Sequence, residues 1–572
     1  MTQDWNRRGV LGAGLAASML PAFGAKAQAL SLSTIPTAPF VIARTNAGKV
    51  RGGTARGAVC FKGIPFGDGV LHDPHGRHMG GLYPPGQSGG NRFKAPQPIA
   101  PWSGVRDALR LGAPTMQAPH QTYGEDEPAY SEDCLFLNVW TPATDGKKRP
   151  VMVYLHGGGY STGSAGSTTQ DGGRMAVVHD VVVVAPNHRL GLLGFLWLGD
   201  ENLGDMYATS GNQGMLDIVA ALRWVRDNIA NFGGDPGNVT IFGESGGGGK
   251  VGTLLGMPQA RGLFHKAGIQ SGAQLTRMPR EVAAETTRRL LRALDITDAR
   301  KLIDVPAQTL LELQWQGEKG QGPLAQPTPG YVAPPSGRES FSESRAPGHF
   351  APVVDGTYLP VDPVDPAVTP LVADIPLLIA NNKEEARFFF LGQPEVYTLD
   401  EAGLKARVQP MLGDRSDAMI TIYRKLRPGA TPSDLFIAIA TAASMGNETV
   451  TLADRKAAQP APVYRYRWDY RSNLPIAGTS EILGAGHATD IGPTFFNWDE
   501  KGLHGNGPGV EQASAHLSAL WASFARTGQP SAPGVPDWPR YDARTRPVML
   551  VDVDCTLVND PDGEAWPLWN KS

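Results

Sequence analysis

The chain has 572 residues, 41% of them hydrophobic, and 52 Lys and Arg residues nearly balance 55 Asp and Glu residues to give a formal net charge of -3. This length allows a large buried core, and the charge balance excludes the basic excess that is typical of nucleic-acid-binding proteins. We therefore expect a small or neutral molecule as ligand and no nucleic-acid partner.

The first 29 residues have the features of an export signal. Arg7 and Arg8 precede a modestly apolar stretch rich in glycine and alanine, and an Ala-x-Ala sequence closes at Ala29. This pattern predicts a twin-arginine signal peptide over residues 1–29, cut after Ala29. The alternative is a frayed N-terminal helix, because the segment is too short and too rich in glycine for a membrane span. We expect a bacterial protein exported to the periplasm or secreted.

Residues 30–572 are predicted to form one domain in which strands and helices alternate. Four nearly continuous apolar runs read as buried strands, at residues 151–155, 181–186, 239–242 and 375–380. Helical spacing of apolar residues follows at 214–232 and again at 513–527. The alternation predicts a mostly parallel sheet with helices on both faces, with ligands bound at the carboxyl ends of its strands. No later apolar stretch is long enough to cross a bilayer.

Three cysteines, Cys60, Cys134 and Cys555, allow at most one disulfide, so we expect stability to come from the core. Cysteine and histidine residues nowhere have the spacing of metal ligands, and we expect no structural or catalytic metal.

The pattern Gly-x-Ser-x-Gly, in which a serine sits on a sharp turn between strand and helix, occurs three times. Ser88 lies in a loop without a preceding strand. Ser161 directly follows the sequence His156-Gly157-Gly158-Gly159, which is typical of an oxyanion-hole loop rather than of a nucleophile. Ser245 follows the predicted strand 239–242, and only small neighbours permit such a tight bend. The context therefore favours Ser245 as a catalytic nucleophile.

A serine nucleophile requires a histidine base, an acid that orients the base, and donors for the oxyanion. The backbone N–H groups of Gly157 to Gly159 and of Gly246 are candidate donors. His487 stands in a loop of small residues after a strand-like segment, although chain order alone does not select it. Glu384 and Glu385 both fit the order expected of the acid, and since adjacent side chains point different ways, at most one can serve.

The chain resembles the type-B carboxylesterases, a family that includes bacterial nitrobenzyl esterases and the cholinesterases, from about Gly48 to Asp552. The matching stretches include Phe61-Lys62-Gly63-Ile64-Pro65-Phe66, Ser131-Glu132-Asp133-Cys134-Leu135, His156-Gly157-Gly158-Gly159-Tyr160, Asn187-His188-Arg189-Leu190-Gly191, Gly211-Asn212-Gln213-Gly214, Gln270-Ser271-Gly272 and Pro352-Val353-Val354-Asp355-Gly356. The resemblance implies an α/β-hydrolase fold with large loop and helical insertions, a small ester as substrate, and no cofactor. It places the catalytic triad on Ser245, Glu385 and His487, and the oxyanion donors on Gly158, Gly159 and Gly246.

Some positions depart from the family pattern. Met116 replaces the usual cysteine partner of Cys134, so we expect Cys134 to be a free, buried thiol. Glycine replaces the usual alanine at Gly246, in a run of four glycines that ends at Lys250. Lys250 is interpreted either as a charge paired with a nearby carboxylate or as an electrostatic tuner of the site. His487-Ala488-Thr489-Asp490 keeps an acidic position where the family has glutamate.

Two further features are candidates for shaping the substrate pocket. The segment 67–90 is longer than in the family, and it could form part of a gorge rim or a passive loop; its three histidines, His72, His75 and His78, could alternatively suggest a metal site. Aromatic residues that flank the predicted site could line a pocket or belong to the core, namely Tyr160, Phe388, Phe389, Phe495 and Phe496.

The sequence thus predicts an exported serine esterase that acts through an acyl-enzyme. The same catalytic groups could act on carbamates, amides or lactones. A non-catalytic binding protein of the same fold is the alternative from another class, and it would require a broken triad or oxyanion hole, of which the sequence gives no sign.

Overall fold

The computed structural model describes residues 36–68, 91–118, 127–326, 328, 348–363, 365 and 369–569. The predicted signal peptide, residues 1–29, lies outside this part of the chain. So do His72, His75 and His78 and most of the segment 67–90, and the interpretations of that segment stay predictions.

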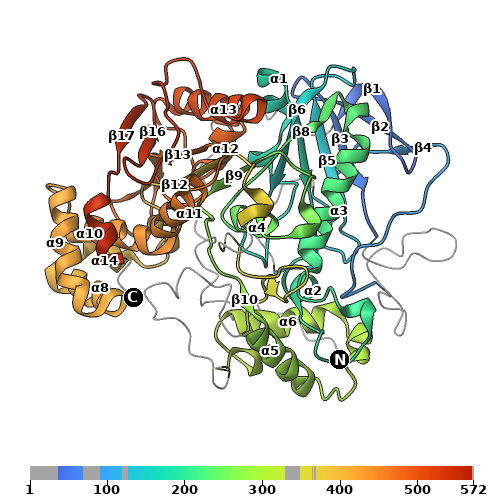
Figure 1. Ribbon diagram of the computed structural model, residues 1–572, viewed down its shortest axis with the longest axis horizontal. Coiled ribbons are helices and arrows are strands. Elements are labelled where there is room, and N and C mark those ends of the chain that lie inside the picture. Colours follow the sequence, from blue (N-terminus) through green and yellow to red (C-terminus); the bar gives the residue numbers. More distant parts are fainter. Residues whose placement is uncertain are drawn as a thin grey trace.

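A mixed sheet of 13 strands runs through the molecule (Figure 1). The strand order is β1-β2-β3-β5-β7-β6-β8-β9-β12-β13-β16-β17, with β4 paired to β2. The seven strands from β7 to β16 in this order are parallel, and the pairs at both ends are antiparallel. Their bounds are β1 Thr37–Arg44, β2 Lys49–Ala55, β3 Ala58–Pro65, β4 Val105–Asp107, β5 Phe136–Thr141, β6 Arg149–Leu155, β7 Val182–Pro186, β8 Gly234–Glu244, β9 Lys266–Gln270, β12 Leu377–Asn382, β13 Val463–Trp468, β16 Pro547–Val551 and β17 Thr556–Asn559.

The four predicted strands are confirmed as β6, β7, β8 and β12, and they lie in the parallel centre of the sheet. Their boundaries differ from the apolar runs, because polar residues also join the ladder. The clearest case is β8, which begins at Gly234 rather than Val239.

Both faces of the parallel strands are buried, as their apolar runs predict. In β6, Val151 and Val153 join the core that contains helix α3 (Gln213–Asn228). Met152 and Tyr154 point the other way, into the core that contains helix α13 (Val510–Thr527). Burying one such side chain contributes roughly 1.5–3 kcal/mol, so the two cores hold the sheet rigidly. Helices α3 and α13 match the predicted helices, although α13 begins three residues before the predicted start at Ala513.

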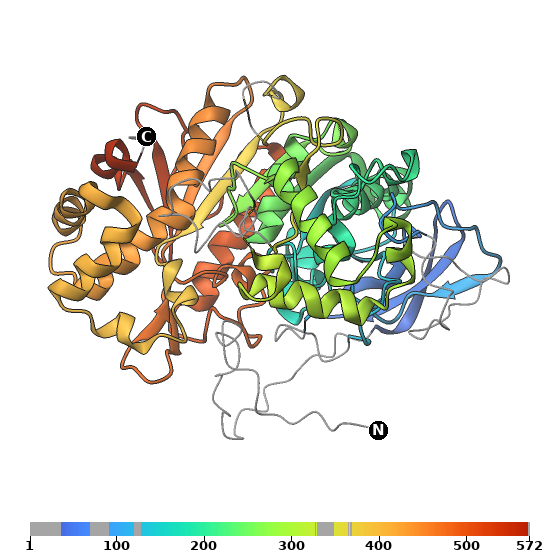
Figure 2. The same ribbon diagram turned by 90° about the horizontal axis from the view of Figure 1, so that it is seen from below.

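Helical insertions form two separate groups around the sheet (Figures 1 and 2). One contains α5 (Arg280–Ala293) and α6 (Ala307–Glu318), and the other contains α8 (Glu401–Leu412), α9 (Ser416–Leu426) and α10 (Pro432–Thr441). The start of α10 is encoded locally, since Thr431 and Asp434 form a capping box and Pro432 occupies the first turn.

One helical stretch among the described residues, Pro432–Ala457, has the length and hydropathy of a membrane span. It joins α10 through a π-helical segment to α11 (Asn447–Ala457), and 94% of its most apolar window is buried inside the protein. This burial is what a core helix of the insertion requires.

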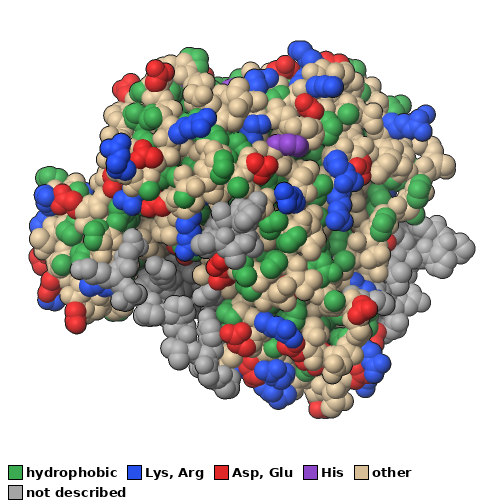
Figure 3. Space-filling model, in the orientation of Figure 1, with side chains coloured by type: hydrophobic (Ala, Val, Ile, Leu, Met, Phe, Trp, Pro, Cys, Tyr) green, Lys and Arg blue, Asp and Glu red, His purple; other side chains and the backbone are tan. Residues whose placement is uncertain are grey.

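On the face shown in Figure 3, Lys and Arg side chains are interspersed with Asp and Glu, and neither sign forms a large field. This distribution agrees with the balanced composition and gives no electrostatic preference on that face for a polyanion.

The carboxyl ends of the parallel strands meet at one edge, where open α/β sheets bind ligands. Gly157 to Gly159 follow β6, Ser245 follows β8, and Glu385 follows β12. His487 follows a small hairpin of β14 (Ser472–Pro475) and β15 (Ile482–Gly484) that comes after β13.

Candidate active site

Ser245 lies on a strained turn between β8 and helix α4 (Gly246–Leu255), which lies near the centre of Figure 1. Its φ of 55° and ψ of -124° are unfavourable for a residue with a side chain. A Cβ at Gly243 would lie 2.5 Å from the carbonyl oxygen of Leu155, so the bend requires glycine there. The backbone N–H of Ser245 is held by the carbonyl of Gln270 at 2.8 Å. The turn therefore presents the hydroxyl away from the strand.

The imidazole of His487 is hydrogen-bonded to the carboxylate of Glu385. His487 Nδ1 lies 2.7 Å from Glu385 Oε2, and both residues are buried. The other oxygen, Glu385 Oε1, accepts from the hydroxyl of Ser271 at 2.5 Å and from the backbone N–H of Asn382 at 2.6 Å. Because a carboxylate oxygen accepts, Nδ1 carries a proton, and the carboxylate fixes the orientation of the ring.

The second ring nitrogen, His487 Nε2, faces Glu244. Nε2 lies 3.3 Å from Glu244 Oε1, which accepts no hydrogen bond among the described residues. Within the same part of the chain, the Ser245 hydroxyl makes no hydrogen bond either. The structure thus joins the predicted acid and base and brings the base beside the residue that precedes the predicted nucleophile, without a hydrogen bond from Ser245 to His487.

Three buried carboxyl groups surround this histidine and change its protonation. Burial alone would lower the pKa of His487, but Glu244, Glu385 and Asp490 outweigh this effect and raise the pKa to about 9. Burial raises the pKa of Glu244 to about 8 and that of Asp490 to about 6, in each case with help from neighbouring carboxylates. The cluster therefore favours the protonated forms of His487 and Glu244 at neutral pH.

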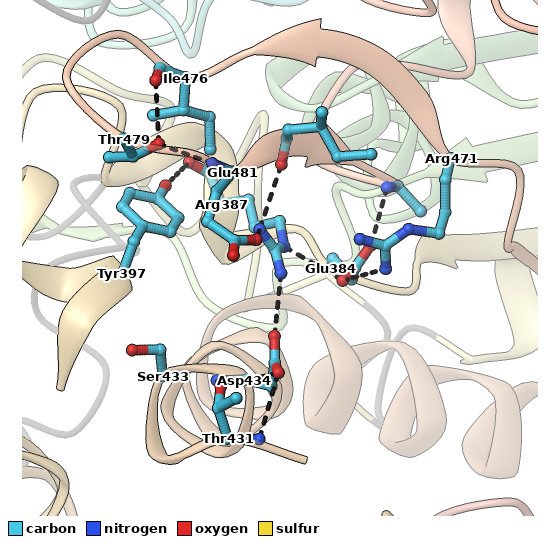
Figure 4. A network of polar contacts seen from close by, with 12 residues as sticks. Glu384, Arg387, Tyr397, Thr431, Ser433, Asp434, Arg471, Ile476, Thr479 and Glu481 are labelled. Atoms are coloured by element: carbon cyan, nitrogen blue, oxygen red, sulfur yellow. Dashed lines mark hydrogen bonds and ion pairs between the residues drawn. The ribbon is translucent and has the colours of Figure 1, made fainter. Parts of the chain in front are cut away.

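Glu384 belongs to a separate network of ion pairs and hydrogen bonds (Figure 4). Its carboxylate accepts from Arg387 Nε at 3.1 Å, from Arg471 Nη1 at 2.7 Å and from the backbone N–H of Ala485 at 3.0 Å. Arg387 also reaches Glu481 at 3.0 Å and Asp434 on α10 at 2.9 Å. This network ties the loop after β12 to the loop that carries His487 and to the helical insertion. Of the two acids that chain order allowed, only Glu385 contacts the histidine.

The glycine loop after β6 lies directly against the nucleophile turn. A Cβ at Gly157 would lie 3.5 Å from Ser245 Cβ, and a Cβ at Gly246 would lie 2.5 Å from Gly159 Cα. Gly158 and Gly159 have φ values of 82° and 62°, which favour glycine. Among the described residues, the backbone N–H groups of Gly158, Gly159 and Gly246 donate no hydrogen bond. These three N–H groups therefore have no acceptor of their own within the described residues, and their role as oxyanion donors stays a prediction.

Among the described residues Lys250 pairs with no carboxylate, contrary to its interpretation as a paired charge. Its side chain is fully buried, and Nζ donates to the carbonyl oxygen of His156 at 2.8 Å. Burial lowers its pKa to about 7. The lysine therefore contacts the start of the glycine loop, a partner that no sequence pattern indicates.

The aromatic candidates divide into two groups. Phe388 and Phe389 are half-buried, and their ring centroids lie 5.6 Å and 4.9 Å from that of His487. Phe495 is fully buried and packs against Tyr154 in the core, so it does not line a pocket. Tyr160 is also buried, and its hydroxyl donates to Gln274 Oε1 at 3.2 Å.

Two site residues were not assigned a role from the sequence. Glu244 immediately precedes the predicted nucleophile, and its place in the Gly-x-Ser-x-Gly motif is the signal that could have found it. Ser271 lies in the matching stretch Gln270-Ser271-Gly272, but nothing in the sequence indicates that its hydroxyl donates to Glu385. Asp490, which was recognised as an acidic position near the base, is buried and accepts from Gln270 Nε2 at 2.6 Å.

The cysteines form no alternative nucleophilic site. Cys60, Cys134 and Cys555 are all free, and Cys134 is buried as predicted. Burial raises the pKa of Cys60 to about 12 and that of Cys134 further, which keeps both thiols protonated. Over the described residues, no group of three or more His, Cys, Asp or Glu side chains is arranged to hold a metal ion.

Comparison with known proteins gives one consistent result. The model of the carboxylesterase family matches residues 39–565. The chain is 35% identical to a para-nitrobenzyl esterase of Bacillus subtilis, over 91% of this chain and 97% of that protein. It is 31% identical to a liver carboxylesterase of Sus scrofa, over 94% of this chain and 93% of that protein. The crystal structure of a Geobacillus stearothermophilus carboxylesterase superimposes with a TM-score of 0.74 at 35% identity and covers 92% of this chain and 100% of that one.

Proposed function

This chain belongs to the carboxylesterase family, has the α/β-hydrolase fold and is a carboxylic ester hydrolase, and we propose that it cleaves esters through an acyl-enzyme intermediate on Ser245. The observation that carries the proposal is the 2.7 Å contact between His487 Nδ1 and Glu385 Oε2 beside the strained turn of Ser245. A serine, a buried acid and a histidine, in this chain order on the loops after β8, β12 and β15, are the parts that acyl transfer by a serine requires.

In the proposed reaction, His487 Nε2 takes the proton of the Ser245 hydroxyl as the oxygen attacks the ester carbonyl. The N–H groups of Gly158, Gly159 and Gly246 stabilise the negative charge on the carbonyl oxygen. Glu385 keeps the proton on Nδ1 and stabilises the imidazolium, which then protonates the leaving alcohol. Water, activated by His487, attacks the acyl-enzyme in the same way and releases the acid.

The proposal is tested with p-nitrophenyl esters of increasing acyl length. Native protein should release a burst of p-nitrophenol stoichiometric with enzyme wherever deacylation is slower than acylation. The variant Ser245→Ala should show neither burst nor turnover above background. Steady hydrolysis by Ser245→Ala would refute the mechanism, whereas carbamate, amide and lactone substrates in the same assay define how far its chemistry extends beyond esters.

We also propose that the protein is exported by the twin-arginine route, with residues 1–29 as the signal. Support comes from the paired Arg7 and Arg8 and from the three free cysteines, because this route carries proteins already folded in the cytosol and no disulfide is needed for the fold. Replacing both arginines with lysine should retain the full-length protein in the cytosolic fraction, and unchanged export would contradict the proposal.

A further inference from the structure

Lys250 is buried beside the site and finds no counter-charge among the described residues. It follows the nucleophile on α4, its side chain has no exposed surface, and its ring contact with Tyr160 is 5.9 Å long. No carboxylate of the described residues changes the pKa of Lys250, which burial alone lowers. Burying an amine without a counter-charge lowers the stability of a fold. The hydrogen bond from Lys250 to the His156 carbonyl is therefore better explained by a role in function than by stability.

That contact belongs to a series of three anchored carbonyl groups in the glycine loop. The His156 carbonyl accepts from Lys250 Nζ at 2.8 Å. The Gly157 carbonyl accepts from His156 Nδ1 at 2.9 Å, since a carbonyl cannot donate. The Gly158 carbonyl accepts from the backbone N–H of Thr162 at 3.0 Å. Only the first anchor comes from outside the loop.

The anchors determine where the N–H groups point. In a trans peptide the C=O and N–H bonds point in opposite directions, so holding the Gly157 carbonyl fixes the N–H of Gly158, and holding the Gly158 carbonyl fixes the N–H of Gly159. Glycine imposes few backbone restraints of its own, and a loop of three glycines can turn its peptides easily. Hydrogen bonds to the carbonyl groups are therefore needed to keep the N–H groups of Gly158 and Gly159 in place.

The glycine run of α4 brings the helix close enough for this contact. A Cβ at Gly246 would lie 2.1 Å from the Gly159 carbonyl oxygen, and a Cβ at Gly247 would lie 2.0 Å from the carbonyl oxygen of Leu155. A Cβ at Gly249 would lie 2.7 Å from the hydroxyl of Tyr160. Helix and loop thus meet backbone to backbone, and the side chain of Lys250 completes the contact.

We propose that Lys250 is a positioning residue of the oxyanion hole, which fixes the His156–Gly157 peptide at the start of the loop through the carbonyl of His156. The N–H groups of Gly158 and Gly159 are held by the two anchors inside the loop, and Lys250 acts on them through the position of His156, whose Nδ1 holds the Gly157 carbonyl. This inference rests on the proposed function, since it assigns Lys250 a part in the same reaction. It also explains the glycine run, because α4 and the loop must be in contact for Lys250 to reach the His156 carbonyl.

The test compares Lys250→Met, which removes the donor, with Lys250→Gln, which keeps a shorter one. The matched control is Lys456→Met on α11, because Lys456 is equally buried, donates to the Val372 carbonyl at 2.6 Å and has a pKa lowered to about 8 by burial. Each variant is assayed for kcat, KM and thermal stability with p-nitrophenyl acetate. Binding of a trifluoromethyl ketone, which forms an oxyanion on the serine, is measured beside binding of the product acid.

Misplaced donors weaken only the states that carry an oxyanion. Lys250→Met should lower kcat by about 10- to 100-fold and weaken the ketone by a similar factor, with KM and product binding nearly unchanged. The kcat and the ketone affinity of Lys250→Gln should lie between those of Lys250→Met and of the native protein. If Lys250→Met does not fold, the test rests on Lys250→Gln. Lys456→Met should lose stability without losing kcat.

Native kcat and native ketone affinity in a folded Lys250 variant would overturn the inference, as would equal losses in Lys250→Met and Lys456→Met. The proposed function fails separately, if Ser245→Ala remains active. An inactive Ser245→Ala together with a fully active Lys250→Met would therefore refute only the positioning role.

Discussion

Glu244 Oε1 lies 3.3 Å from His487 Nε2, the ring nitrogen that faces away from Glu385. The base of the proposed mechanism is thus placed between two buried carboxyl groups, one on each nitrogen. Because a neighbouring negative charge favours the imidazolium, both raise the pKa of His487, which reaches about 9 in spite of burial. We therefore expect Glu244 to raise the pH at which His487 loses its proton.

Replacing Glu244 with glutamine should move the pH profile to lower pH. A general base works only when it is unprotonated, so kcat/KM rises with pH through the pKa of His487. Removing a facing charge lowers that pKa, and the acid limb should shift downward by about 1–3 pH units. The measurement is kcat/KM from pH 5 to 10.

Asp552→Asn serves as the control for this shift, since Asp552 is another partly buried carboxyl whose pKa burial raises, and it does not act on His487. An unshifted or upward-shifted acid limb in Glu244→Gln would show that Glu244 does not govern the base.

Glu385 and Glu384 should differ sharply when each is changed to glutamine. Glu385→Gln removes the acceptor that keeps the proton on His487 Nδ1 and should lower kcat by about 10³- to 10⁴-fold. Glu384→Gln breaks contacts with Arg387 and Arg471 instead, and it should cost about 1–3 kcal/mol of stability while kcat stays near the native value. Steady-state kinetics and urea unfolding check both, and a reversed pattern would reassign the acid.

Gly246→Ala should impair this protein although the family usually has alanine there. The added Cβ would lie 2.1 Å from the Gly159 carbonyl oxygen, so the glycine loop must move. We expect kcat to fall by about 10- to 100-fold with a small change in KM. Gly446→Ala is the control, because its Cβ meets its nearest neighbour at 3.6 Å, an ordinary contact. Equal activity of both variants would contradict the close approach.

All three cysteines should behave as free thiols. The melting temperature should be the same with and without a reducing agent, because the structure contains no disulfide to break. Buried Cys60 and Cys134 should react with a thiol reagent only after unfolding, whereas half-buried Cys555 should react slowly in the native protein. Fewer than three reactive thiols in unfolded, unreduced protein would reveal a disulfide.

The sequence predicted the fold well because its parallel strands are buried on both faces. Apolar runs such as those of β6 and β7 are the direct result of that burial. The position of Ser245 was equally predictable, since a strand that breaks at glycine before a serine has few other structural explanations.

The sequence could not predict the contacts that side chains make with backbone groups. Lys250 was interpreted as a charge paired with a carboxylate or as an electrostatic tuner, but its acceptor is a carbonyl oxygen, which every residue carries and no side-chain pattern indicates. Chain order alone likewise left Glu384 and Glu385 open, and it was the family resemblance that selected Glu385; the turn after β12 sends the two side chains to different partners. Phe495 shows the same limit, because an aromatic residue near a site and one in the core look alike in sequence.

The central claim is that Ser245 forms the acyl-enzyme, and a fluorophosphonate probe tests it most directly. The probe reacts only with a serine that is activated by a neighbouring base. Mass spectrometry of the labelled, folded protein should find one adduct on the peptide that contains Ser245, no adduct in Ser245→Ala, and ester hydrolysis lost in proportion to labelling. Labelling at another residue, or full hydrolysis after complete labelling of Ser245, would contradict the mechanism.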